Sequence, residues 1–154
     1  MTPQSKKIPE SVLVIIYTRD LEVLLIERAD RPGSWQSVTG SRDSLDEPLR
    51  DTAIREVAEE TGIHVGSSPA SDGALIDWNQ HIVYDIYPAW LHRYAPGVTR
   101  NTEHVFGLLV DRSVPVRLAP AEHLRHRWLG WQEAADACFS STNANAIRQL
   151  PRLS

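Results

Sequence analysis

The chain has 154 residues, of which 42% are hydrophobic and 23% charged, and its formal net charge is −4. This length fits one domain, residues 1–154, and the acidic balance disfavours a protein that coats a nucleic-acid polymer. A phosphorylated small molecule remains an acceptable partner, because a bound metal can offset acidic side chains locally. The single cysteine, Cys138, excludes an intramolecular disulfide and a cysteine-based zinc cluster.

The N-terminal region contains no signal for membrane insertion or export. Residues 1–10 are polar, and the apolar run Val12–Tyr17 is too short to span a bilayer. No small-residue cleavage site follows that run. We therefore expect a cytoplasmic protein with no membrane partner; the sequence is silent on oligomeric state.

The first part of the chain predicts three strands followed by a helix. Val12–Tyr17 is a continuous run rich in β-branched residues, which indicates a buried strand. Glu22–Arg28 predicts a second strand and Trp35–Thr39 a short third one. Between Glu47 and Gly62 apolar residues recur at spacings of three and four, which predicts an amphipathic helix. Pro48 suits the first turn of this helix, and Gly62 suits its end.

The second part predicts a loop over Ser67–Gly73, then further strands and a helical end. The expected strands are Ala74–Asp77, Ile82–His92, Val105–Val110 and His126–Leu129, and the expected helices are Trp131–Ala137 and Asn143–Leu150, with Asn143 as a helix N-cap. Strands interleaved with helices indicate the α/β class, built as an α/β/α sandwich around a mixed sheet.

Three carboxylates gather on one side of the predicted helix. Each helical residue turns by about 100°, so Glu56, Glu59 and Glu60 share one arc roughly 100° wide. Glu56 and Glu60 border the apolar stripe, whereas Glu59 and Arg55 point further toward solvent. Like charges that border a core repel each other, and a hard divalent cation such as Mg²⁺ relieves that repulsion.

A solvated acidic helix face is the simpler alternative, and Glu-Glu near a helix end is common by itself. The combination of parts weakens this alternative, because a strand ends at the Gly40 loop, a helix follows, and its acids lie at the edge of the core. The segment Gly40–Ile63 resembles the Nudix box: Glu47, Arg55, Glu56, Val57, Glu59, Glu60, Gly62 and Ile63 match its fixed positions. Six residues instead of five separate Gly40 from Glu47, which we interpret as a one-residue loop insertion.

The resemblance to Nudix hydrolases implies the Nudix-type fold and a role for each box position. Glu56 and Glu60 would bind Mg²⁺, with Mn²⁺ as a substitute, and Glu59 would bind metal or polarise water. Arg55 would hold an acid in place through an ion pair, and Glu47 would brace the loop against the helix.

Two segments outside the general box narrow the resemblance. Residues 92–103 and Trp35–Gly40 are similar to the bacterial dihydroneopterin triphosphate diphosphatases, and the similarity extends from about Lys7 to Ile147. That family removes pyrophosphate from 7,8-dihydroneopterin triphosphate in folate biosynthesis and leaves the monophosphate. It implies a small triphosphate as substrate.

The same resemblance, together with residue chemistry, suggests the binding positions. The substrate-binding candidates are Lys7, Arg28, Thr39, Tyr84, Asp85, Ile86, Tyr87, Arg100 and Ser140. Basic side chains suit phosphate, and tyrosines suit a flat pterin. Packing in a β core is the alternative for at least one tyrosine, and a helix cap is the alternative for Ser140. Glu122 matches a carboxylate that adds a metal ligand from outside the box, although an ordinary loop acid would also fit.

The implied reaction is attack of water at phosphorus, assisted by Mg²⁺. Either Glu59 or Glu122 could accept the proton of that water. Two rival interpretations stay open: the same chemistry on dATP, another nucleoside triphosphate or an oxidised nucleotide, and a Nudix-fold module that senses a nucleotide without hydrolysing it. The three intact box acids argue against the sensor.

Overall fold

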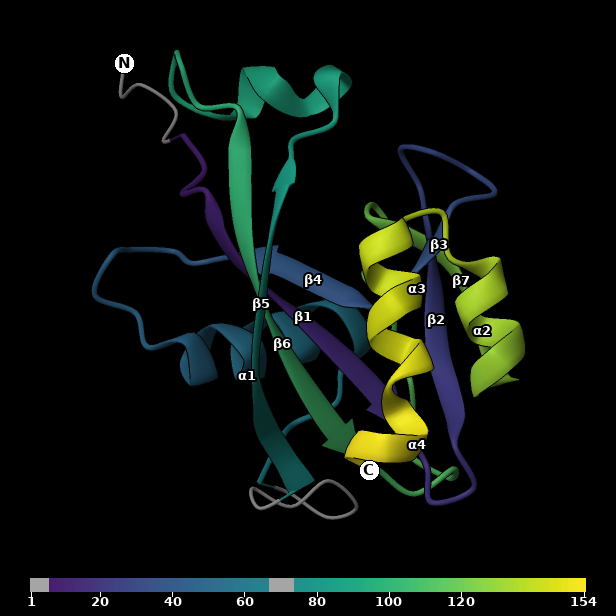
Figure 1. The fold of residues 1–154 in the computed structure, drawn as a ribbon. Helices are drawn as coiled ribbons and strands as arrows, with labels where there is room; N and C mark the ends of the chain where they lie inside the picture. Colours follow the sequence, from purple (N-terminus) through teal and green to yellow (C-terminus); the bar gives the residue numbers. More distant parts are fainter. Residues whose placement is uncertain (1–5, 67–73) are drawn as a thin grey trace.

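The computed structural model describes residues 6–66 and 74–154. Within these residues, a seven-stranded mixed sheet forms the middle layer and helices cover both of its faces (Figure 1). The strands are β1 (Glu10–Tyr17), β2 (Glu22–Arg28), β3 (Trp35–Gln36), β4 (Val38–Ser41), β5 (Leu75–Asp85), β6 (Arg100–Leu109) and β7 (His123–Gly130). The helices are α1 (Leu49–Thr61), α2 (Trp131–Ala137), α3 (Ser141–Arg148), α4 (Leu150–Leu153) and the 3-10 helix η2 (Pro88–Arg93).

The strands run in the order β3-β2-β1-β6-β5, with β4 paired to β1 and β7 paired to β2. β1 and β6 are parallel, whereas the other named pairs are antiparallel. Helix α1 lies behind the sheet in Figure 1, and α2, α3 and α4 lie in front of it. The predicted α/β/α sandwich around a mixed sheet is confirmed.

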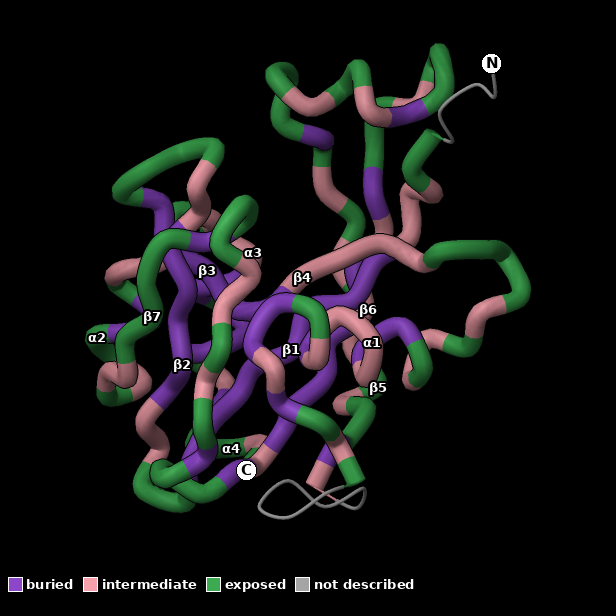
Figure 2. The backbone as a smooth tube through the Cα atoms, turned by 180° about the vertical axis from the view of Figure 1, so that it is seen from behind, coloured by how far each residue is buried: buried purple, intermediate pink, exposed green. Residues whose placement is uncertain are grey.

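Alternate residues of β1 supply the two cores of the molecule. Val12 and Val14 pack on the α1 side with Val57, whereas Leu13 and Ile15 pack on the side of α2 and α3. The buried segments therefore run through the middle of the molecule, as Figure 2 shows. Full burial of one such side chain contributes about 1.5–3 kcal/mol, so this strand holds the two outer layers together.

The two edges of β1 are paired differently, and this opens the sheet. Along one edge β6 accompanies the whole strand. Along the other edge β2 pairs only at Tyr17, while β4 pairs with residues 11–14. β2 and β4 thus separate at the N-terminal end of β1, next to the start of α1.

Helix α1 is shorter than predicted at its N-terminus. Pro48 is the N-cap and not a first-turn residue, because its ψ of 142° is extended. Gly62 ends the helix as predicted: its φ of +74° is left-handed, and its N–H donates to the carbonyl of Ala58.

Four further predictions about local structure were wrong. The single strand predicted over Trp35–Thr39 is interrupted at Ser37 and forms β3, which pairs with β2, and β4, which pairs with β1. The two strands predicted between residues 74 and 92 form one strand, β5, whose pairing with β6 is irregular between Asp77 and Gln80. The end of the predicted second strand is η2, since Pro88 lacks the N–H that a ladder needs. The N-cap of α3 is Ser140, whereas the Asn143 amide bonds Ser37. The loop predicted for Ser67–Gly73 lies outside the described residues.

Candidate active site

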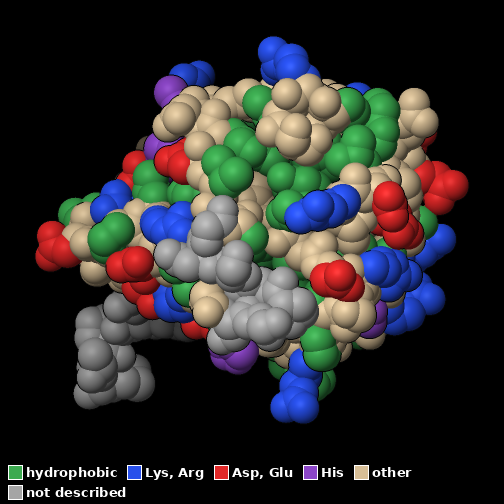
Figure 3. Space-filling model, turned by 90° about the horizontal axis from the view of Figure 1, so that it is seen from below, with side chains coloured by type: hydrophobic (Ala, Val, Ile, Leu, Met, Phe, Trp, Pro, Cys, Tyr) green, Lys and Arg blue, Asp and Glu red, His purple; other side chains and the backbone are tan. Residues whose placement is uncertain are grey.

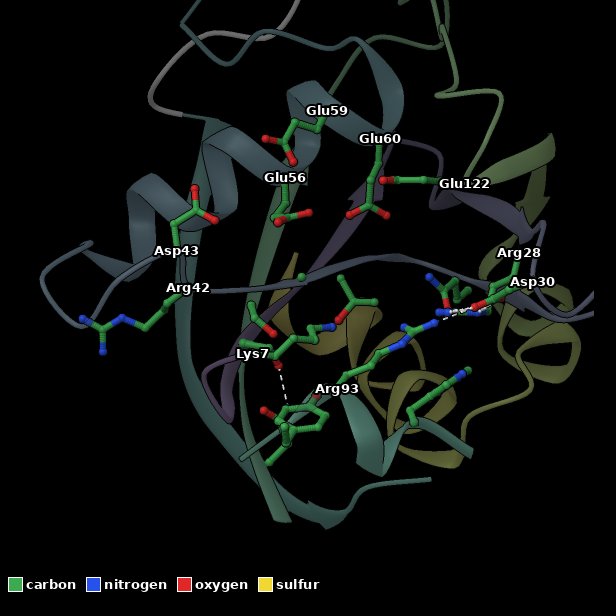
Figure 4. A pocket seen from close by; sticks show the side chains of 18 of the residues that line it. Lys7, Arg28, Asp30, Arg42, Asp43, Glu56, Glu59, Glu60, Arg93 and Glu122 are labelled. Atoms are coloured by element: carbon green, nitrogen blue, oxygen red, sulfur yellow. Dashed lines mark hydrogen bonds and ion pairs between the residues drawn. The ribbon is translucent and has the colours of Figure 1, made fainter. Parts of the chain in front are cut away.

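A cleft of about 650 Å³ opens where β2 and β4 separate, between α1 on one side and η2 on the other. It is lined by Lys6, Lys7, Ser11, Arg28, Asp30, Gln36, Thr39, Gly40, Ser41, Arg42, Asp43, Glu56, Glu59, Glu60, Tyr84, Trp90, Arg93, Tyr94, Asn101, Ala121, Glu122 and His123. Two groups of opposite charge face each other in it (Figure 4). We call Glu56, Glu59, Glu60 and Glu122 the acidic wall, and Lys7, Arg28 and Arg93 the basic wall.

The acidic wall combines one buried acid with more exposed ones. Glu60 is only 3% exposed, and the side chain of Glu56 is 13% exposed, whereas that of Glu59 is 56% exposed. Glu122 comes from the loop before β7, and its side chain extends toward Glu60 (Figure 4). The helix therefore directs Glu56 and Glu60 into the cleft and Glu59 to its rim.

Burial dominates the electrostatics of the two inner acids. It raises the pKa of Glu60 well above its usual range, and a hydrogen bond with the neighbouring Glu56 carboxyl adds to that shift. Burial likewise raises the pKa of Glu56, although Arg55 opposes this effect. His123 Nε2 lies 3.6 Å from Glu60 Oε1, but burial lowers the pKa of this histidine, so the contact is not an ion pair at neutral pH. The inner acids thus lack a full counter-charge.

Arg55 joins the loop before α1 to the acidic wall. Its guanidinium donates to both Glu47 carboxylate oxygens at 3.0 Å, to Glu56 Oε1 at 2.8 Å and to the Ser41 carbonyl at 3.0 Å. Glu47 also accepts from the Asp43 N–H and the Thr52 hydroxyl, and chiefly the Arg55 bond lowers its pKa to about 2. The predicted bracing role of Glu47 is confirmed, and the one-residue insertion is accommodated in the loop between Gly40 and Glu47.

Gly40 lets the Glu56 carboxylate approach β4. A Cβ added at this glycine would overlap the carboxylate carbon and both carboxylate oxygens of Glu56. Glycine is therefore required at the end of this strand for a steric reason, because any side chain here would displace the Glu56 carboxylate.

The basic wall is assembled from three distant segments. Lys7 is bridged to Tyr94, and its N–H donates to the Arg93 carbonyl at 2.8 Å. Although Lys7 has a large exposed area, its ammonium points into the cleft (Figure 4), where loss of water and then the Arg93 charge lower its pKa. Arg28 forms two hydrogen bonds of 2.7 Å with Asp30 and lies over the Trp90 ring at 4.3 Å. This wall is thus cationic but partly neutralised by Asp30.

The structure brings only some of the predicted site residues together. Lys7, Arg28, Thr39, Tyr84 and the four acids line the cleft, whereas Asp85, Ile86, Tyr87, Arg100 and Ser140 do not. Arg100 forms an exposed ion pair with Asp85. Ile86 is buried, Tyr87 is 45% exposed beside Trp90, and Ser140 caps α3.

The sequence analysis did not predict several of the residues that line the cleft. Asn101 and Ser11 are buried polar residues, and Trp90 and Asp30 contact Arg28. Ser11 and Asn101 lie at the polar starts of β1 and β6, so no local pattern marked them as buried. Asp30 and Trp90 lie in a loop and in the 3-10 helix, where no periodic pattern marks a residue as facing a site.

Comparison with known proteins shows which family the chain belongs to. The model of the NUDIX domain matches residues 7–150. The chain belongs to the NUDIX family. The dihydroneopterin triphosphate diphosphatase of Haemophilus influenzae is 39% identical over 91% of this chain and 85% of its own length. The enzyme of that name from Escherichia coli K12 is 42% identical over 94% of this chain and 93% of its own length. A solved structure of the E. coli dihydroneopterin triphosphate pyrophosphohydrolase superposes with a TM-score of 0.84 at 40% identity, over 95% of this chain and 97% of the other.

NUDIX hydrolases generally use divalent metals, and the acidic wall fits such an ion in chemistry. Glu60 Oε2 is buried and lacks a hydrogen-bond partner among the described residues, and burial disfavours the charged forms of Glu56 and Glu60 in the absence of a cation. No set of three His, Cys, Asp or Glu side chains is already gathered as metal ligands in residues 6–66 and 74–154. Glu56 and Glu60 are the inner acids that could hold such a cation, and Glu59 and Glu122 line the same cleft.

The remaining surface adds two observations. In the described part of the chain, no helix is both long and apolar enough to cross a membrane. The face drawn in Figure 3 carries acidic and basic side chains interspersed with apolar ones. Opposite charges are thus mixed on that face, whereas in the cleft they are separated into two walls.

Proposed function

We propose that this NUDIX protein hydrolyses dihydroneopterin triphosphate to the monophosphate and pyrophosphate, with Mg²⁺ bound at the acidic wall. The observation that carries the proposal is the 39–42% identity, over nearly the whole chain, to relatives named for this reaction. A cleft with an acidic and a basic wall supports it, because a triphosphate must be held at both the reacting and the distal phosphates.

Glu56 and Glu60 would hold the metal, with Glu122 and Glu59 as further ligands. When bound, the ion neutralises charge that develops on the phosphate oxygens and lowers the pKa of a coordinated water. Arg55 fixes the Glu56 carboxylate, and Lys7, Arg28 and Arg93 orient the phosphate chain by charge-assisted hydrogen bonds. Either Glu59 or Glu122 would accept the proton of the attacking water, and both line the cleft.

The decisive experiment is a turnover panel with Mg²⁺. It compares kcat/KM for dihydroneopterin triphosphate, dATP, other nucleoside triphosphates and dinucleotides, with separate assays for pyrophosphate and orthophosphate. We expect the pterin to be preferred and pyrophosphate to be released. A higher kcat/KM for dATP, or release of orthophosphate, would reject this substrate and leave the family assignment in place.

A binding measurement tests the metal separately from turnover. Mg²⁺ should raise the melting temperature of the substrate-free protein, because it binds the native state and relieves repulsion in the acidic wall. EDTA should abolish activity without unfolding the chain. Melting curves that ignore Mg²⁺, together with activity that survives chelation, would contradict the proposal; Mn²⁺ in parallel tells whether it substitutes.

A further inference from the structure

Asn101 presents an unused hydrogen-bond acceptor at the cleft. The residue lies on β6, is 1% exposed and lines the cleft. Its side-chain nitrogen donates to Ser11 Oγ at 2.7 Å and to the Tyr84 hydroxyl at 3.1 Å. Its carbonyl oxygen Oδ1 is buried and has no hydrogen-bond partner in the described part of the chain. A buried carbonyl oxygen without a hydrogen-bond partner is unfavourable, so a ligand that donates a hydrogen bond to this atom would be stabilised.

The sheet holds this amide in a fixed orientation. Asn101 is the register partner of Tyr84 on β5, and Ser11 projects from β1, the strand on the other side of β6. The amide is therefore bonded from both neighbouring strands, and these two bonds hold the plane of its side chain at the cleft. A preorganised acceptor of this kind loses little freedom when a ligand binds.

The surroundings define which ligand group fits. The Ser11 and Tyr84 hydroxyls accept from Asn101, so each keeps its own proton to donate. An acceptor between two potential donors matches a ring edge in which an N–H group is adjacent to a carbonyl. The acidic and basic walls are suited to the metal and the phosphates, which leaves this polar group for the heterocycle.

We propose that Asn101 is a specificity-determining residue whose Oδ1 accepts a hydrogen bond from the ring N–H at the lactam edge of the substrate. The inference rests on the proposed function, because a pterin carries such an edge, with its ring N–H next to a carbonyl. Adenine has no ring N–H on its pyrimidine edge, so the amide favours the pterin. Ser11 and Tyr84 are positioning residues that fix the amide.

The test measures binding of neopterin, which lacks the phosphate chain, and of neopterin methylated at the ring N–H. Both ligands are titrated by fluorescence into the wild type, Asn101→Leu and Gln80→Leu. Gln80 is the matched control, because its amide lies on β5 outside the cleft and bonds Gln149. We expect the wild type and Gln80→Leu to bind neopterin about tenfold or more tightly than the methylated form, and Asn101→Leu to bind both alike and weakly.

Turnover gives a second readout. Asn101→Leu should raise KM for dihydroneopterin triphosphate about tenfold while kcat changes little, since the contact is made equally in the ground and transition states. If Asn101→Leu does not fold, Asn101→Ala takes its place in both measurements, with the same expected results. Equal affinity of the wild type for both ligands overturns the inference. A wild type that fails in the turnover panel but still discriminates between the neopterins would reject the proposed reaction and leave this binding edge intact.

Discussion

The two walls of the cleft differ in how the chain builds them. Three of the four acids of the acidic wall come from consecutive turns of one helix, and Arg55 anchors that helix to its preceding loop. The basic wall consists of Lys7, Arg28 and Arg93, which come from three segments far apart in the sequence. The Arg28 guanidinium is already hydrogen-bonded to Asp30. The acidic wall is preorganised around two inner carboxyl groups whose charged forms burial disfavours, whereas the basic wall can exchange an internal partner for a phosphate. Changes in the acidic wall should therefore affect turnover, and changes in the basic wall should affect affinity.

The largest effect is expected at the inner acids. Glu56→Gln and Glu60→Gln should each lower kcat by about 100-fold or more, because each removes a metal ligand that contributes to transition-state stabilisation. The fold should persist, since an uncharged amide replaces a carboxyl whose charged form is disfavoured by burial. Steady-state kinetics with a thermal melt checks both points. Near-normal turnover in a folded variant would remove these acids from the catalytic site.

A smaller loss is expected when the acidic wall is disturbed without touching its charges. Gly40→Ala should lower kcat about tenfold or more, because the new Cβ displaces the Glu56 carboxylate and misplaced catalytic groups lose rate. Gly130→Ala is the matched control, since its φ of −54° is ordinary and an added Cβ meets nothing within 4 Å. Equal activity of the two variants would show that the position of the Glu56 carboxylate is not critical.

The basic wall should respond in KM. Arg28→Ala should raise KM for the triphosphate about tenfold with little change in kcat, because a phosphate contact of this kind is uniform binding. Arg100→Ala is the control of equal charge: this side chain is 72% exposed, is paired with Asp85 and lies outside the cleft lining. We expect Arg100→Ala to leave both constants unchanged. If Arg100→Ala raised KM as much as Arg28→Ala, the wall would extend beyond the cleft described here.

The same contrast explains what the sequence could predict. The acidic wall follows from helical periodicity and local spacing, so Glu56, Glu59 and Glu60 and their order of burial were predictable. The sandwich architecture followed from the alternation of strands and helices. The basic wall depends on which distant segments meet, and no local pattern distinguishes Arg28 in the cleft from Arg100 outside it. The strand expected up to His92 failed because Pro88 turned the chain into η2, which is where Trp90 and Arg93 reach the site.

The smallest expected effect concerns stability and a buried acid, Glu103, which contacts Thr39 of the cleft lining. Glu103 is 4% exposed on β6, and the Thr39 hydroxyl lies 3.2 Å from its Oε2. Tyr84 and Tyr94 also lie near it, and the Glu103 charge contributes to raising the pKa of both phenols. Burial raises the pKa of Glu103 to about 7, although the Thr39 bond opposes this effect.

Because the folded-state pKa lies above the unfolded value, the native state retains a proton that the unfolded chain releases. The stability from this proton is fully present below the unfolded pKa and is lost as the pH rises through the folded pKa. Linkage then predicts that the free energy of unfolding falls by about 1 kcal/mol from about pH 6 to about pH 7 through this group. Glu103→Gln mimics the protonated acid and should remove that part of the slope. Urea unfolding of both proteins at the two pH values, with saturating Mg²⁺ to hold the acidic wall in one state, measures the difference. Equal slopes for the two proteins would show that Glu103 is already ionised in the folded protein throughout this pH range.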